Sequence, residues 1–536
     1  MGDLERRFAS VEKVATVYSR CSMPYQHFCH SLRNYVTLSY MAYSGQLMFR
    51  IIFFGALFLA LGLGAHTAIA QNVINGPSVS TADSVIGRIY LEGMQHSHAE
   101  TLAQVLMDSI GPRLTGTPAN RAANNWLVRT YTAWGIPARN EQSRIYRNWT
   151  RGPSRIELMA PRVRSLEATA LAWSPATPPG GVTGDVVLAR DSAGWLETVR
   201  GKFVLLTAPE INCRPDSSWA RYALPAEYQA MRAARDSASR VWPVVDISKL
   251  EAAGVAGILT SKWAGGWGVD KIIGAQATIA PVFDLSCEDY SLLARLATHG
   301  QHPRIHAVAD VHMAPKEAPL YNTIAELKGT EHPNQYIILS AHLDSWDSGS
   351  GAIDDGTGTI IMLEAMRLLK LAYPHPKRTI IVEQWSGEEQ WMSGLFHQKH
   401  PEVVRGLQAE LTQDSGTGAI GYVIGPSCPG DSMTFARWVA PLPTSLIPYG
   451  IRIQPSGDTT TCRYAPSFEL YSSDRDHDRY STAWDYEPYT YHTNRDTFDK
   501  INFNDLKRTA TLVALLAYEA SEDHHTTRLQ PPDDHP

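Results

Sequence analysis

The segment QYIILSAHLDSWDSGSGAIDDGTGTIIMLEAMRLLKL, residues 335–371, decides the fold. It opens with a short apolar run, Gln335–Ala341, which is typical of a strand buried on both faces. It closes with Gly356–Leu371, where Ile360, Leu363, Met366 and similar residues recur at helical spacing. A polar loop that contains histidine and aspartate joins the two. The segment therefore predicts a strand, a functional loop and a helix.

The chain on both sides repeats this alternation. Arg378–Gln384 and Gly406–Gln413 are predicted strands, and residues 505–520 form a predicted amphipathic helix. Upstream, helical spacing covers residues 88–112 and 119–134. Strands that alternate with helices favour an α/β fold, with a mostly parallel mixed sheet flanked by helices.

Histidines and acids follow these strands at the points where the strands end. They are His342 and Asp344 after the first, Glu388 and Glu389 after the second, Asp414 after the third, Asp354 and Asp355 before a helix, and His492 before the last helix. In an open α/β sheet, ligands collect beyond the carboxyl ends of the strands. Each feature alone has a simpler explanation, such as a helix cap or a solvated turn. Their joint convergence on one edge predicts a site.

The residue types point to two divalent metal ions. Two such ions share one carboxylate, and each takes a histidine and a further carboxylate. His342, His492 and Asp414, with one residue from each acidic pair, supply that count. Imidazole with carboxylate suits zinc in an open, catalytic site. A remaining glutamate can act as general base, and Asp344 can accept the second ring N–H of His342.

Four segments, HLDSWDSGSGAIDDGTG, WSGEEQ, LTQDSG and YHTNRDTFDK, resemble in order and spacing the co-catalytic zinc aminopeptidases related to bacterial leucyl aminopeptidase. Trp385–Gln390 and GPRLTGTPAN at 111–120 resemble the subgroup of plasma glutamate carboxypeptidases. The resemblance covers roughly residues 85–520. It implies two Zn²⁺ per chain, a peptide substrate with a free amino end, and a homodimer.

The resemblance also assigns roles, position by position. It implies His342 and Asp414 on one zinc, Glu389 and His492 on the other, Asp354 as the bridge, and Glu388 as the general base. The chain departs from the family pattern after Glu389 and upstream of His492. The second departure contains His477, which we regard as a candidate substrate contact and not as a metal ligand.

The resemblance divides the chain into a peptidase domain and an insertion. We expect the domain's first part over 80–164, the insertion over 165–318, the zinc-binding part over 319–525, and a tail over 526–536. The insertion shows short β-rich runs with one predicted helix, Ser248–Ala253, and resembles a protease-associated domain. It is implied to cover the site and to favour dipeptides and short peptides.

The N-terminal region predicts export. An apolar run at 51–65 follows Arg50, and Ala68 and Ala70 stand in the pattern that signal peptidases recognise. We therefore expect a signal peptide over 48–70, cleaved after Ala70, with 1–47 as a doubtful extension. The run is shorter than the ~20 residues that a bilayer span needs, so no stable membrane span is expected after cleavage.

Composition and cysteines agree with an exported globular enzyme. The 536 residues are 44% hydrophobic with a net charge of −6, and the lack of a basic stripe argues against nucleic acid as a partner. Four cysteines lie beyond the leader, and we favour the pairs Cys213–Cys287 and Cys428–Cys462.

Two alternatives remain on the sequence alone. One is a glutaminyl cyclase-like enzyme of the same fold that uses a single zinc. The other is a non-catalytic, receptor-like ectodomain, although such proteins lose ligands and this sequence retains all five. Dinuclear zinc hydrolysis of short peptides is the function that the sequence favours.

Overall fold

The computed structural model describes residues 83–392, 395–425, 430–455, 466–472 and 489–527. The predicted signal peptide, Cys428, Cys462, His477 and the tail from 528 lie outside these residues. No helix in the described part of the chain has both the length and the apolar character that a membrane span needs.

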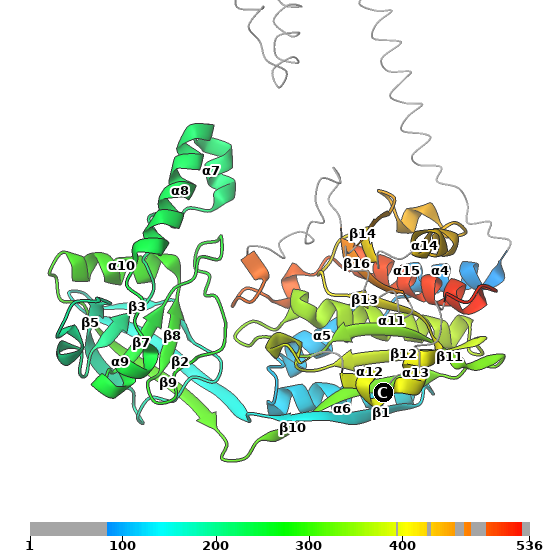
Figure 1. Ribbon diagram of the computed structural model, residues 1–536, viewed down its shortest axis with the longest axis horizontal. Coiled ribbons are helices and arrows are strands. Elements are labelled where there is room, and N and C mark those ends of the chain that lie inside the picture. The colour runs from blue at the N-terminus through cyan, green and yellow to red at the C-terminus, as the bar shows by residue number, and fades with distance from the viewer. Residues whose placement is uncertain (1–82, 393–394, 426–429, 456–465, 473–488, 528–536) are drawn as a thin grey trace, which may run out of the picture. The chain divides into compact units, whose positions relative to one another are not determined.

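The first of two large sheets contains the strands predicted around the site (Figure 1). Its spatial order is β1 (Ala138–Tyr146), β10 (Ala318–Leu327), β12 (Arg378–Trp385), β11 (His332–His342), β13 (Leu407–Gln413), β16 (Ser467–Ser472), β14 (Ile420–Gly425) and β15 (Arg452–Pro455). The central strands β12, β11, β13 and β16 run parallel, and antiparallel pairs flank them. The predicted α/β class with a mixed sheet is confirmed.

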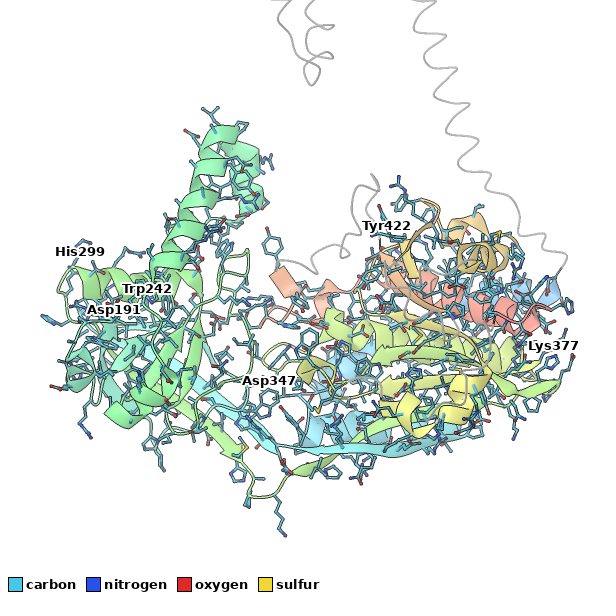
Figure 2. All side chains as sticks on the ribbon, in the orientation of Figure 1. Asp191, Trp242, His299, Asp347, Lys377 and Tyr422 are labelled. Carbon is cyan, nitrogen blue, oxygen red and sulfur yellow. A yellow bond between two sulfur atoms is a disulfide. The ribbon has the colours of Figure 1, made fainter. Side chains whose placement is uncertain are left out.

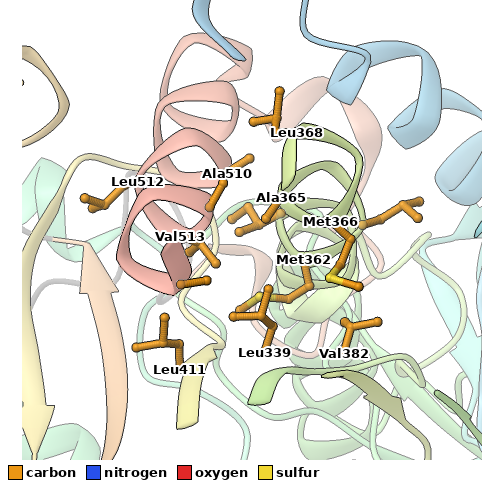
Figure 3. Close-up of a cluster of buried hydrophobic side chains, with 14 of the residues drawn as sticks. Leu339, Met362, Ala365, Met366, Leu368, Val382, Leu411, Ala510, Leu512 and Val513 are labelled. Carbon is orange, nitrogen blue, oxygen red and sulfur yellow. The ribbon is translucent and has the colours of Figure 1, made fainter. Parts of the chain in front are cut away.

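Alternate residues of the central strands enter two different cores. Ile337 and Leu339 belong to the larger core, which α11 (Thr357–Ala372) and α15 (Phe503–Glu522) cover, as Figure 3 shows. Ile338 packs on the opposite face with residues of α12 (Leu395–Lys399) and α13 (Pro401–Gly406). Because successive side chains of a strand point to opposite faces, a strand covered on both faces is apolar at nearly every position.

Helix α11 is buried around almost its whole circumference. Its sequence, TGTIIMLEAMRLLKLA, explains this, since a helix without a continuous polar face is stable only inside a core. The helix and strands predicted around residues 335–413 are confirmed, as are α6 (Pro118–Ala133) and α15. Thr117 caps α6 by accepting the N–H of Asn120, and Pro118 occupies its first turn.

The prediction of one continuous helix over 88–112 was wrong. The chain instead forms α4 (Ser84–Gln95), α5 (Ala99–Gln104) and a π-helical turn, Val105–Ile110. The break has a polar cause. The hydroxyl of Ser97 and the N–H of His98 both donate to the buried carboxylate of Glu364 at 3.0 Å, which draws the backbone out of the helix.

The second sheet is formed by residues between Trp149 and Met313. Its order is β3 (Arg164–Leu166), β2 (Trp149–Ala160), β9 (Arg304–Met313), β5 (Val182–Leu188), β6 (Phe203–Leu205), β7 (Gly257–Thr260), β8 (Val282–Leu285) and β4 (Ala168–Ala170). The first strand of this sheet in chain order, β2, begins at Trp149, whereas the insertion was expected to start at residue 165.

The expectation of one helix in this region was wrong. Besides α9 (Ile247–Ala253), it contains α7 (Asp216–Tyr222), α8 (Pro225–Val241) and α10 (Cys287–Thr298). Met231 is the one buried residue of α8, although its sequence carries a proline in the first turn and residues that favour helix, a signal that the β-rich interpretation of this region passed over. The predicted Cys213–Cys287 disulfide is confirmed and joins the segment before α7 to α10.

Candidate metal centre

The predicted ligands come from five separate segments of the first sheet and its loops. His342 ends β11, Asp354 lies in the turn before α11, Glu389 lies in a 3₁₀ turn after β12, and Asp414 follows β13. His492 lies in the loop that leads toward α15. The parallel register aligns His342 with Trp385, so the loops after β11 and β12 begin side by side.

The carboxylate of Asp354 lies between the two histidines. Its Oδ1 is 3.3 Å from His342 Nε2, and its Oδ2 is 3.0 Å from His492 Nε2. Asp414 Oδ2 lies 3.6 Å from His342 Nε2, and Glu389 Oε2 lies 3.1 Å from His492 Nε2. The five side chains form two half-sites, each with one histidine and one further carboxylate, joined by Asp354.

Asp355 is the neighbour that spacing alone could not separate from Asp354. Candidate ligand atoms group in two ways, one joining His342, Asp354 and Glu389 and the other joining His342, Asp355 and Asp414. The Oδ1 of Asp355, however, accepts the N–H of Gly358 at 2.9 Å in the first turn of α11. Because Asp354 reaches both histidines and Asp355 is engaged as a helix cap, the geometry favours Asp354 as the bridge.

Asp344 lies beside His342, as predicted, but through a different atom. Nδ1 of His342 is 2.9 Å from the backbone carbonyl of Asp344, whereas the nearest carboxylate oxygen is 3.7 Å away. A ring N–H that donates to this carbonyl leaves Nε2 directed at the carboxylates. The Asp344 carboxylate accepts instead from the hydroxyl of Thr115 at 2.6 Å and from the N–H of Glu388 at 3.2 Å.

Charge and burial act against one another throughout the cluster. Burial alone would lower the pKa of His342, but the carboxylates of Asp414 and Asp354 raise it well above its ordinary value. Burial likewise opposes the charged form of His492, yet Asp354 and Glu389 raise its pKa. Burial raises the pKa of Glu388, with His342 acting in the opposite sense.

Four buried polar atoms of the cluster make no well-formed hydrogen bond within the described residues, although His342 Nε2 and Asp354 Oδ2 lie within ion-pair distance of their neighbours. They are Nε2 of His342, Oδ2 of Asp354, Oδ2 of Asp355 and Oε1 of Glu389. Buried polar atoms are almost always hydrogen-bonded, so four atoms without a well-formed hydrogen bond in one place need an explanation. All are nitrogen or carboxylate oxygen atoms, the donor types that bind zinc in open sites. The residues therefore fit a divalent metal centre.

Comparison with known proteins identifies the family. Residues 322–407 match the sequence profile of Peptidase family M28. The chain is 28% identical to carboxypeptidase Q of Homo sapiens over 384 residues, which covers 68% of this chain and 76% of that protein. It is 30% identical to carboxypeptidase Q of Rattus norvegicus over 359 residues, which covers 65% of this chain and 70% of that protein. The chain belongs to peptidase family M28.

A solved structure agrees with the family in fold. The crystal structure of an M28 peptidase precursor from Shewanella amazonensis superimposes with a TM-score of 0.60 at 22% identity, covering 84% of this chain and 98% of that one. The resemblance stated from the sequence motifs is confirmed. As an M28 peptidase related to carboxypeptidase Q, the chain is a hydrolase of the metallo-exopeptidase type.

Arg113 is a site residue of this M28 peptidase that the sequence did not single out. Its guanidinium is fully buried and donates from Nε to Leu343 O at 2.7 Å, from Nη1 to Ser350 O at 2.8 Å, and from Nη2 to Gly351 O at 2.7 Å. Arg113 thereby fixes both ends of the loop that runs from His342 to Asp354. It stands in the quoted GPRLTGTPAN segment, but its contacts lie more than 200 residues away.

Asp496 organises the same region from the other side. Its carboxylate accepts the N–H of Ile353 at 2.6 Å and of Asp354 at 3.1 Å. It comes four residues after His492, so one short loop supplies both a candidate ligand and a support for the bridging aspartate. Burial raises the pKa of Asp496 to about 7.

Aromatic rings enclose the two histidines of the M28 centre. Tyr491 stacks on His492 with ring centroids 3.8 Å apart, and Trp346 lies 5.6 Å from the same imidazole. Trp385 lies 6.2 Å from His342. These rings restrict the orientation of the imidazoles and limit water at the site.

Proposed function

We propose that this M28 peptidase is a dinuclear zinc exopeptidase that hydrolyses dipeptides or short peptides with a free amino end. The observation that carries the proposal is the position of the Asp354 carboxylate between His342 Nε2 and His492 Nε2, at 3.3 and 3.0 Å. One carboxylate oxygen toward each histidine is the arrangement that a shared bridging ligand requires.

The chain's own residues then divide the work. His342 and Asp414 would hold one ion, Glu389 and His492 the other, and Asp354 both. Zinc, when bound, supplies Lewis acidity toward the scissile carbonyl and makes water a stronger nucleophile. Glu388 would take the proton from the attacking water and return it to the nitrogen of the leaving amine as the peptide C–N bond breaks. The N–H of Glu388 donates to Asp344, which supports that placement of the base.

The substrate class rests on two separate considerations. The free amino end comes from the resemblance of the motif segments to zinc aminopeptidases. The named relatives are carboxypeptidases, which release a residue from the other end. A dipeptide satisfies both descriptions, because its single peptide bond adjoins a free amine on one side and a terminal carboxylate on the other. Dipeptides are therefore the substrates that we favour.

Export, the protease-associated character of the second-sheet region, and a homodimer belong to the same proposal. The Cys213–Cys287 disulfide supports export, because disulfides persist in oxidising compartments. The region of the second sheet, residues 149–313, contacts the loops that carry the proposed ligands, and these contacts support a role for it at the site. Arg151 on β2 pairs with Asp347 at 2.6 and 2.8 Å, and Trp173 packs edge-on against Trp346 (Asp347 is labelled in Figure 2).

Metal removal tests the dinuclear claim. Dialysis against a chelator should abolish peptidase activity, and titration with Zn²⁺ should restore it with an end point at two ions per chain. The count should be measured by elemental analysis beside the activity. Full activity at one ion per chain would favour the single-zinc cyclase-like alternative, and two bound ions without turnover would favour the receptor-like one.

A matched set of substrates tests the end-specificity. We expect a free dipeptide to be cleaved, and its N-acetyl form to lose at least ~100-fold in kcat/KM, because an amine-binding group would be left unpaired. The C-terminal amide of the same dipeptide shows whether the carboxylate is also recognised. Equal cleavage of the free and N-acetylated dipeptides would overturn the requirement for a free amine.

A further inference from the structure

A segment of the second-sheet region, residues 268–274, lies directly against the loop that carries His492. The N–H of Ile272 donates to the carbonyl oxygen of His492 at 2.7 Å. Lys271 and Thr493 form an antiparallel β-bridge. The backbone of the candidate ligand is thus hydrogen-bonded by a part of the chain that lies about 220 residues away in sequence.

Asp270 and Asn494 add two hydrogen bonds to this pairing, one donated by each residue to the other. The N–H of Asp270 donates to Asn494 Oδ1 at 3.0 Å, and the N–H of Asn494 donates to the carbonyl of Asp270 at 3.2 Å. Three successive residues of the ligand loop, 492–494, are therefore held by three successive residues of the segment, 270–272.

Thr169 on β4 connects the segment to the other half-site. Its buried hydroxyl donates to Asp270 Oδ2 at 3.0 Å and lies 3.2 Å from the hydroxyl of Ser348. Ser348 stands in the loop between His342 and Asp354. One hydroxyl thus contacts both the segment that supports His492 and the loop that follows His342.

His492 needs such support because its backbone is in an unfavourable conformation. Its φ is +54°, in the left-handed region that residues other than glycine rarely adopt. A residue in this region persists when the surrounding contacts fix it. The hydrogen bonds to residues 492–494 are contacts of that kind.

We propose that the segment 268–274, fixed by Thr169, positions His492. It thereby sets the zinc affinity of the half-site that contains His492 and Glu389. This inference rests on the proposed dinuclear function. Residues 168–274 would then contribute to metal binding without supplying a ligand, beyond any role in covering the site. Thr169 and Asn494 are positioning residues in this proposal, because neither is among the five proposed ligands.

Thr169→Val and Thr169→Ser form a matched pair for the test. Valine keeps the shape of threonine and removes the hydroxyl, whereas serine keeps the hydroxyl. Zinc affinities should be measured by chelator competition on the full chain, from the apoprotein to saturation. We expect Thr169→Val to weaken zinc binding at the site of His492 by about 10–100-fold, as loss of a supporting hydrogen bond does in other metal sites. The site of His342 should weaken less, because the hydroxyl of Thr169 reaches its loop only at Ser348. Thr169→Ser should bind zinc as the wild type does.

Asn494→Ala provides an independent variant, since it removes the acceptor for the N–H of Asp270 without altering β4. Weaker zinc binding at the site of His492 alone is expected, with kcat recovering at excess zinc. Wild-type affinity at both sites in Thr169→Val and Asn494→Ala would overturn the inference and leave the proposed function standing. A wild-type enzyme that binds fewer than two ions would overturn both.

Discussion

Replacing Glu388 with glutamine is expected to lower kcat by about 10²–10⁴-fold, the range that a positioned general base contributes. The amide is nearly isosteric with the carboxylate, so the 3₁₀ turn after β12 and the hydrogen bond from its N–H to Asp344 should persist. What is lost is the capacity to take a proton from water. Steady-state kinetics on a free dipeptide at saturating zinc measures the effect.

Two controls separate loss of the base from loss of the centre. Zinc content and thermal stability of Glu388→Gln should match those of the wild type, because Glu388 is not one of the five proposed ligands. Glu402→Gln, which alters an exposed acid on α13, should leave kcat unchanged. Glu388→Gln with wild-type kcat would show that another group accepts the proton.

The elements around the centre were predictable because their signals are local. Strands β11, β12 and β13 are buried on both faces, so apolar residues lie close together in their sequences and can be recognised without knowledge of the fold. Parallel strands bring their carboxyl ends to one edge, which places His342, Glu389 and Asp414 together without knowledge of any contact. Burial gives no such guide for α8, where Met231 is the one buried residue, and its helix-favouring composition was the signal left unused.

Finer details of the centre depend on contacts between distant segments. The choice of Asp354 over Asp355 follows from which oxygen faces His492 and which accepts the N–H of Gly358. The acceptor for His342 Nδ1 is the backbone carbonyl of Asp344. Every residue has a backbone carbonyl, so the order of side chains in the sequence could not predict which one accepts. The family resemblance implied Asp354 as the bridge where spacing left Asp354 and Asp355 open, and that assignment stays a proposal.

Arg113 is the clearest case of a functional support without a local signal, and it gives the prediction with the largest effect on stability. Arg113→Met keeps an unbranched side chain of similar reach but removes every guanidinium donor. The carbonyls of Gly111, Leu343 and Ser350 would then lose their guanidinium donor, each at a cost of about 1–3 kcal/mol, whereas the carbonyl of Gly351 keeps the N–H of Gly356. We expect the free energy of unfolding of the zinc-free protein to fall by at least ~3 kcal/mol, measured by urea denaturation.

The variant should also bind zinc more weakly, because the loop that Arg113 fixes connects His342 to Asp354, the proposed bridging ligand. Burial lowers the pKa of Arg113 to about 10, so the guanidinium is still charged at neutral pH and every one of its donors is available. Arg113→Lys keeps the charge but has fewer, differently placed donors, and an intermediate loss is expected. Arg155→Met, at an exposed position on β2, should change stability by no more than about 0.5 kcal/mol. If Arg113→Met unfolds at the wild-type urea concentration, the loop owes its conformation to Asp496 and to the second-sheet region, and Arg113 contributes charge without fixing geometry.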